Sequence, residues 1–234
     1  MFPEISVQSL ATSWWETDSS ATIGRGRLIK VIVPYPDMKP YRLVPIGRGA
    51  DGRQHDTASF RIEEFRTGEP VADVSTLPVA GLPLRTGETY LVRRGKIRPA
   101  LVLATSGPAV SPDLRAGAAR WQSSSTLLVA PYYGATSDGT RGGWNPAFVA
   151  RIQRVEYSQY LWDSLPIGGS DAGSILRLDH LLPIGADPAN WQSTPHRLSA
   201  DAMAFIDDWF SWHVTGALAG GGVLECARAT LGGL

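Results

Sequence analysis

Three residues of this sequence have the types and spacing that acid–base chemistry on a phosphate requires. Arg177 and Asp179 interrupt an apolar run at positions i and i+2, and Arg98 stands directly before Pro99 at the start of another apolar run. In an extended strand, positions i and i+2 project to the same face of the sheet. A cation and a carboxylate on one apolar face form either a structural ion pair or a functional site.

Cleavage of an RNA strand by transesterification is a reaction that such a set could carry out. The reaction needs a base to accept the 2′-hydroxyl proton, a cation to stabilise the phosphorane oxygens, and an acid to protonate the departing 5′-oxygen. One carboxylate and one or two guanidiniums can fill these roles without a metal ion or a cofactor. The histidines and the single cysteine have no metal-ligand spacing, and GGSDAG (168–173) is not a serine-hydrolase elbow.

Three blocks of the sequence, each rich in β-forming residues and bounded by glycine, proline or serine, are expected to position these residues. They are GETYLVRRGKIRPALVLA (87–104), TLLVAPYYG (126–134) and GSILRLDHLLPIG (173–185). Abundant glycine and proline and few helical patterns favour a mainly β fold. Ser199 has the character of an N-cap for an amphipathic helix that ends near Gly216, and residues 148–157 could form a strand or a short helix.

The three blocks, in this order, resemble the PemK/MazF/Kid family of toxins from toxin–antitoxin systems. The first resembles the family's first hairpin, in which Arg-Pro follows a loop. The second resembles the next strand and its turn, and the third resembles the strand that carries an Arg-x-Asp pattern. The resemblance covers about residues 84–216. It implies a small, bent antiparallel barrel of the SH3-like type, with extra N-terminal strands and a C-terminal helix.

The resemblance also implies an activity and its site. It implies a metal-independent endoribonuclease, without a cofactor, that cleaves single-stranded RNA and leaves a 2′,3′-cyclic phosphate and a 5′-hydroxyl. Asp179 would be the base, Arg177 the acid or stabilising cation, and Arg98 the support for the phosphate. The partners implied are single-stranded RNA, a cognate antitoxin and a second copy of the chain.

Other residues beside these three are expected to bind RNA. Arg93, Arg94 and Lys96 form a compact basic cluster, which is either a phosphate anchor or a solvated hairpin tip. Tyr133 stands where the family usually has a catalytic Thr or Ser, and Thr136 follows shortly after. The hairpin loop is also shorter than in the family. These departures leave an alternative open, namely a catalytically inactive barrel that binds a protein or a nucleic acid.

Composition and charge set wider limits on function. The 234 residues carry 22 basic and 22 acidic side chains, so RNA binding must come from a local patch and not from net charge. A single cysteine, Cys226, cannot form an internal disulfide, which fits a reducing compartment. The sequence has no signal-peptide pattern and no run long enough to span a membrane. A cytoplasmic protein without a membrane partner is therefore expected.

The chain is expected to divide into three segments. They are a β-rich N-terminal extension (1–83), the toxin-like barrel with its C-terminal helix (84–218), and a Gly-rich tail (219–234) that is mobile or adds an edge strand. The extension is expected to cover barrel surface that smaller relatives use for partners. The adjacent Trp14 and Trp15 are the natural anchors for such a cover.

Overall fold

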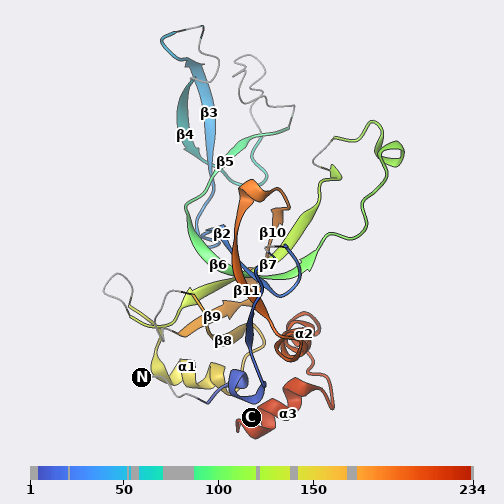
Figure 1. The fold of residues 1–234 in the computed structure, drawn as a ribbon. Coiled ribbons are helices and arrows are strands. Elements are labelled where there is room, and N and C mark those ends of the chain that lie inside the picture. The colour runs from blue at the N-terminus through green and yellow to red at the C-terminus, as the bar shows by residue number, and fades with distance from the viewer. Residues whose placement is uncertain are drawn as a thin grey trace. The chain divides into compact units, whose positions relative to one another are not determined.

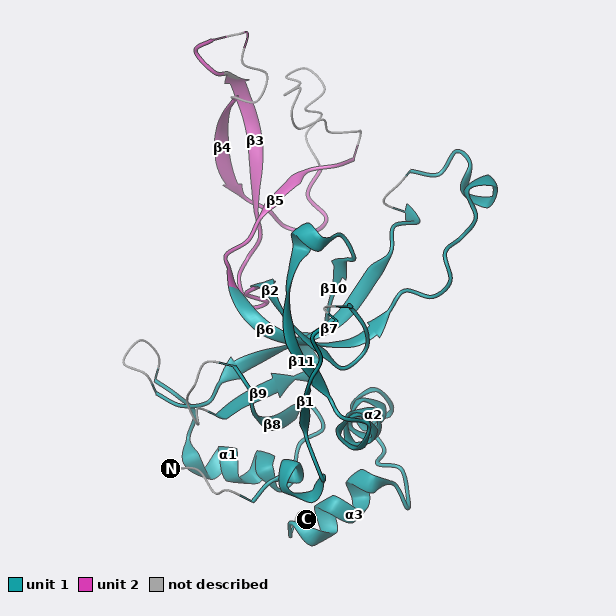
Figure 2. Ribbon diagram, in the orientation of Figure 1, with its two compact units in different colours: residues 1–33, 97–234 teal, residues 34–96 magenta. Residues whose placement is uncertain are grey.

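The structure, a computed structural model, describes residues 5–20, 22–51, 53, 58–70, 87–119, 122–137, 142–167 and 173–232. The chain falls into two compact units, which Figure 2 colours separately: unit 1 comprises residues 1–33 and 97–234, and unit 2 comprises residues 34–96. The expected boundary at residue 83 lies outside the described residues. Within the described ranges, no helix is long and apolar enough to cross a membrane.

Unit 1 is built around a curved antiparallel sheet, as Figure 1 shows. Its strands follow the order β1-β11-β2-β6-β7-β9-β8, and β10 pairs with the first half of β7. The bounds are β1 (Trp15–Thr17), β2 (Arg27–Pro34), β6 (Gly95–Thr105), β7 (Thr126–Gly134), β8 (Tyr160–Ser164), β9 (Gly173–Arg177), β10 (Leu182–Gly185) and β11 (Trp191–Leu198). The predicted mainly β, bent antiparallel fold is confirmed.

The central strands of this sheet are apolar on both faces, because each face covers its own hydrophobic core. In β2, Leu28 is fully buried in a large core that also contains Leu101 and Trp209. The next residue, Ile29, points to the other face and is fully buried with Val102. Strands buried on both faces have continuous apolar runs and not the alternation of apolar and polar residues that a half-exposed strand shows. This explains the apolar runs in the sequences of β2, β6 and β7.

Among the residues that the structure describes, three α-helices accompany the sheet: α1 (Pro146–Gln153), α2 (Ala200–Thr215) and α3 (Val223–Thr230). The predicted C-terminal helix is confirmed as α2, because the Ser199 hydroxyl accepts a hydrogen bond from the Ala202 N–H at 3.1 Å and Gly216 ends the helix with φ of 75°. Residues 148–157, expected as a strand or a helix, contain most of α1. The expected tail contains α3, which packs against α2.

Short 3₁₀ helices occur at η1 (Val7–Leu10), η2 (Pro112–Arg115), η4 (Leu178–His180) and η5 (Pro188–Asn190).

In its described ranges, unit 2 contains a three-stranded antiparallel sheet in the order β4-β3-β5. The strands are β3 (Tyr41–Arg48), β4 (Ala58–Glu64) and β5 (Tyr90–Val92). The expected hairpin over residues 87–104 is wrong, because its two strands lie in different sheets. β5 pairs with β3, whereas both edges of β6 are taken by β2 and β7 of unit 1. Residues 93–94 are therefore a link between two sheets and not the tip of a hairpin.

A buried carboxylate fixes the N-terminal segment to unit 1. Asp163 of β8 is fully buried and accepts hydrogen bonds from the indole N–H groups of Trp14 at 3.4 Å and Trp15 at 3.0 Å. The Tyr132 hydroxyl donates to it at 2.7 Å, and the side-chain amide of Gln8 donates as well. Burial raises the pKa of Asp163 to about 6, although these four hydrogen bonds act in the opposite direction. The adjacent tryptophans therefore anchor this segment to the sheet.

Candidate functional site

The block expected as one strand over residues 173–185 is interrupted at the candidate site. β9 ends at Arg177, the 3₁₀ turn η4 follows, and β10 begins at Leu182. Both strands pair with β7, β9 with its end and β10 with its beginning, so the chain must shift between two registers. Asp179 consequently lies in the turn, and its placement on a strand at i+2 was wrong.

Arg177 and Asp179 nevertheless form a bidentate ion pair. Nε of Arg177 donates to one carboxylate oxygen at 2.7 Å, and Nη2 donates to the other at 2.6 Å. The side chain of Arg177 is 14% exposed and that of Asp179 is 31% exposed. Burial acts to raise the pKa of Asp179, but the hydrogen bonds and charge of Arg177 lower it below its usual value. The carboxylate is therefore ionised at neutral pH.

His180 extends this pair into a longer hydrogen-bonded chain. Nη2 of Arg177 lies 2.8 Å from Nε2 of His180, and the hydroxyl of Tyr133 lies 2.8 Å from Nδ1. A guanidinium can only donate, so Nε2 is the acceptor. The imidazole is then neutral, carries its proton on Nδ1 and donates it to the oxygen of Tyr133. Hydrogen bonds therefore link these side chains one after another, from Asp179 through Arg177 and His180 to Tyr133.

The strand register explains why Tyr133, Arg177 and Tyr160 lie together. In the β8–β9 pairing, Tyr160 is directly opposite Arg177. In the β7–β9 pairing, Tyr133 is opposite Ile175, which is two positions from Arg177. Residues opposite each other, or two apart on one strand, share a face of the sheet. The neighbouring Tyr132 projects from the other face, where it contacts the buried carboxylate described above.

Arg98 completes an alternation of cations and rings across the neighbouring strands β6, β7, β9 and β8. Its guanidinium carbon lies 4.2 Å from the ring centroid of Tyr133. The guanidinium carbon of Arg177 lies 5.8 Å from the same centroid and 4.7 Å from that of Tyr160. These are cation–π distances. We call Arg98, Tyr133, Arg177 and Tyr160 the Arg–Tyr row.

The charge of this site is locally positive. Its two guanidiniums are offset by one carboxylate, that of Asp179, and His180 is neutral. In addition, Nε of Arg98 is buried and has no hydrogen-bond partner among the described residues. A buried donor without an acceptor is costly, but this nitrogen is closed to solvent and an incoming anion cannot reach it. The excess of positive charge is what suits the site to bind an anion such as a phosphodiester.

None of the contacts described above for the Arg–Tyr row involves the other expected RNA-binding residues, although Lys96 lies on β6 two positions before Arg98. Arg93, Arg94 and Lys96 are exposed in unit 2, where the guanidinium of Arg94 lies 5.7 Å from the ring centroid of Tyr35. Thr136 follows the end of β7 in unit 1. The site described here is therefore built from unit 1 alone, from Arg98, Tyr133, Arg177 and Asp179 of the expected set and from two residues that were not expected, Tyr160 and His180.

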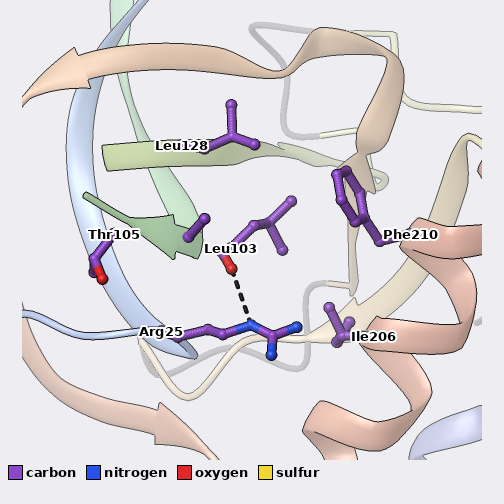
Figure 3. Close-up of a pocket in the computed structure, with 7 residues that line it drawn as sticks. Arg25, Leu103, Thr105, Leu128, Ile206 and Phe210 are labelled. Atoms are coloured by element: carbon purple, nitrogen blue, oxygen red, sulfur yellow. Dashed lines mark hydrogen bonds between the residues drawn. The ribbon is translucent and has the colours of Figure 1, made fainter. Parts of the chain in front are cut away.

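A separate pocket of about 430 Å³ lies where β6, β7 and α2 meet, as the close-up in Figure 3 shows. It is lined by Arg25, Leu103, Ala104, Thr105, Leu128, Ile206 and Phe210. Nε of Arg25 donates to the Leu103 carbonyl at 3.0 Å, and its guanidinium pairs with Asp207. Because this cation is already paired and the walls are mostly apolar, the pocket lacks the acid–base groups of the Arg–Tyr row.

The residues that the structure describes do not bring three carboxylate, imidazole or thiol groups together as a metal-binding cluster. Compared with models of known protein families, the chain matches none, and a search of curated proteins finds no match either.

Proposed function

We propose that this protein is a metal-independent endoribonuclease that binds single-stranded RNA on the Arg–Tyr row and cleaves it by transesterification. One observation carries the proposal: Arg98, Tyr133, Arg177 and Asp179 converge from three separate segments of the chain. Each of the three blocks that resemble PemK/MazF/Kid toxins contributes to this site. The proposal includes the finer fold, in which the curved sheet of unit 1 corresponds to the SH3-like barrel of that family.

Phosphate binding is assigned to the two arginines. A guanidinium presents N–H groups in a planar fork that matches the oxygens of a phosphate. The guanidinium of Arg98 is held over the ring of Tyr133. Arg177 is held in one orientation by its contacts with Asp179 and His180. Such fixed cations stabilise the charge that develops on a phosphorane.

The proton transfers are assigned to Asp179 and Tyr133. Asp179 accepts the proton of the 2′-hydroxyl, whose oxygen then bonds to phosphorus while the bond to the 5′-oxygen breaks. The departing 5′-oxygen takes the phenolic proton of Tyr133. His180 donates a hydrogen bond from Nδ1 to the Tyr133 oxygen and stabilises the negative charge formed there. The products are a 2′,3′-cyclic phosphate and a 5′-hydroxyl.

The bidentate ion pair favours a second candidate, a binding module without catalysis. Both oxygens of Asp179 already accept from Arg177, and this lowers the tendency of the carboxylate to take a proton. In this case the Arg–Tyr row binds a nucleic acid or an acidic protein segment without cleaving it. The other partners that the resemblance implies, a cognate antitoxin and a second copy of the chain, apply to both candidates.

Cleavage of a long single-stranded RNA in the presence of EDTA separates the two candidates. We expect the wild type to cleave it, and Asp179→Asn and Tyr133→Phe to bind it but cleave at least about 100-fold more slowly. Arg197→Gln removes a half-exposed arginine on β11, outside the strands of the row, and should cleave like the wild type. Binding without cleavage by the folded wild type would favour the binding module, and the absence of both would reject both candidates.

A further inference from the structure

Four aromatic side chains form a compact cluster in unit 1. Trp144 precedes α1, Phe148 lies on α1, Tyr157 follows the helix, and Tyr160 begins β8. The ring centroids of Trp144 and Phe148 are 5.3 Å apart, those of Phe148 and Tyr157 are 5.3 Å apart, and those of Phe148 and Tyr160 are 5.5 Å apart. All four side chains are half-buried. We call these residues the aromatic cluster.

The aromatic cluster is continuous with the Arg–Tyr row, because Tyr160 belongs to both. Arg177 lies opposite Tyr160 across the β8–β9 pairing, with its guanidinium carbon 4.7 Å from the ring centroid. A second cation, Arg151, which pairs with Glu156, lies 5.1 Å from the ring centroid of Tyr157 and is mostly exposed. The rings are therefore flanked by guanidiniums, one of which is proposed above to hold a phosphate.

Packing on the core and against one another leaves these four side chains partly accessible. They cover a buried cluster that contains Val149, Ile152, Trp162 and Ile175. Aliphatic side chains would cover such a core equally well, whereas aromatic rings that remain partly accessible offer a flat surface with a negative face. Single-stranded nucleic acids are bound by this combination of stacking rings and cations along the backbone.

We propose that the aromatic cluster is a nucleobase-stacking subsite, in which a base next to the phosphate held by Arg177 stacks on Tyr160 and its neighbours. This inference rests on the proposed function, since it names how the same site holds its substrate. Stacking of this kind is tolerant of sequence because every base has a π-face. The subsite therefore selects single-stranded over paired RNA, since only an unpaired base can rotate away from its strand and stack on a side chain.

The test compares two non-cleavable strands in EDTA: a 2′-O-methyl oligoribonucleotide of mixed sequence, and a strand of the same length in which every residue is abasic. Both carry the phosphates, and only the first carries bases. We expect the wild type to bind the strand with bases roughly 5- to 150-fold more tightly, as the loss of one stacked base would give. Tyr160→Leu should reduce this preference, and Tyr160→Phe, which keeps the ring, should retain it.

The outcomes separate this inference from the proposed function. Equal binding of both strands by the wild type overturns the stacking subsite and leaves the phosphate site intact. Binding of neither strand by the folded wild type overturns both. A preference for the strand with bases, in a protein that cleaves no RNA, supports the subsite and rejects only the enzymatic activity. Because the wild type alone gives the preference, the test does not depend on folding of the Tyr160→Leu variant.

Discussion

Replacing Asp163 by asparagine should change the pH dependence of stability in a direction that the structure specifies. The carboxylate is fully buried and accepts from Gln8, Trp14, Trp15 and Tyr132. Its burial raises the pKa to about 6 from an ordinary value of 3.8, against the effect of the four donors. Asparagine keeps the shape of the side chain but cannot titrate in this range.

The sign and size of the effect follow from this pKa shift. Between pH 3.8 and about 6 the folded state keeps the Asp163 proton while the unfolded state has released it, so stability falls as the pH rises. The contribution is complete below pH 3.8 and is lost as the pH passes through the folded-state pKa. Since one pKa unit corresponds to about 1.4 kcal/mol, the wild type loses about 3 kcal/mol of unfolding free energy across this window. The Asp163→Asn variant lacks this loss.

Urea unfolding of both proteins, followed by tryptophan fluorescence from about pH 4 to about pH 7, measures the effect. The unfolding free energy of Asp163→Asn minus that of the wild type should increase by about 3 kcal/mol as the pH rises. Asp18→Asn serves as a control that should stay nearly constant over this range, because hydrogen bonds from Ser20 lower the pKa of Asp18 below its ordinary value of 3.8 and its effect on stability changes only at lower pH. A difference for Asp163→Asn that stays constant with pH would refute the reasoning. A drift in favour of the wild type would mean that the four donors outweigh burial.

Substitutions at three further positions test the packing of unit 1 by chemical denaturation. Asp179→Asn should lower the unfolding free energy by no more than about 1 kcal/mol, because its pair with Arg177 is partly solvated; a loss of about 3 kcal/mol or more would make the pair structural. Gly173→Ala should cost about 3 kcal/mol or prevent folding, since a Cβ there would lie 1.5 Å from the Trp162 ring; a neutral effect would contradict that packing. Ser199→Ala should cost about 1 kcal/mol by removing the N-cap of α2, whereas Ser199→Thr should cost less.

Features set by local sequence could be predicted. The strand over residues 126–134 was expected with the bounds of β7, because a run of β-forming residues ends at glycine. The helix from Ser199 to Gly216 was expected because its caps are local signals. The contact between Arg177 and Asp179 could be anticipated for the same reason, since the two residues are near neighbours in the chain.

Features set by distant strand pairing could not be predicted. β5 pairs with β3 and not with the following strand, because the pairing of one strand edge depends on where all the other strands lie. Tyr160 enters the site only through its register opposite Arg177. His180 had one local signal, since it directly follows Asp179, but its contact with Tyr133 depends on the turn that interrupts the strand.

The most direct test of the central claim is whether cleavage requires the 2′-hydroxyl. Wild-type protein is incubated in EDTA with a single-stranded RNA and with the same strand carrying 2′-O-methyl groups throughout, and the product ends are identified by mass spectrometry. Transesterification predicts that both strands bind, that only the RNA is cut, and that the products carry a 2′,3′-cyclic phosphate and a 5′-hydroxyl. Cleavage of the 2′-O-methyl strand, or an RNA that is bound and stays intact, would contradict the account.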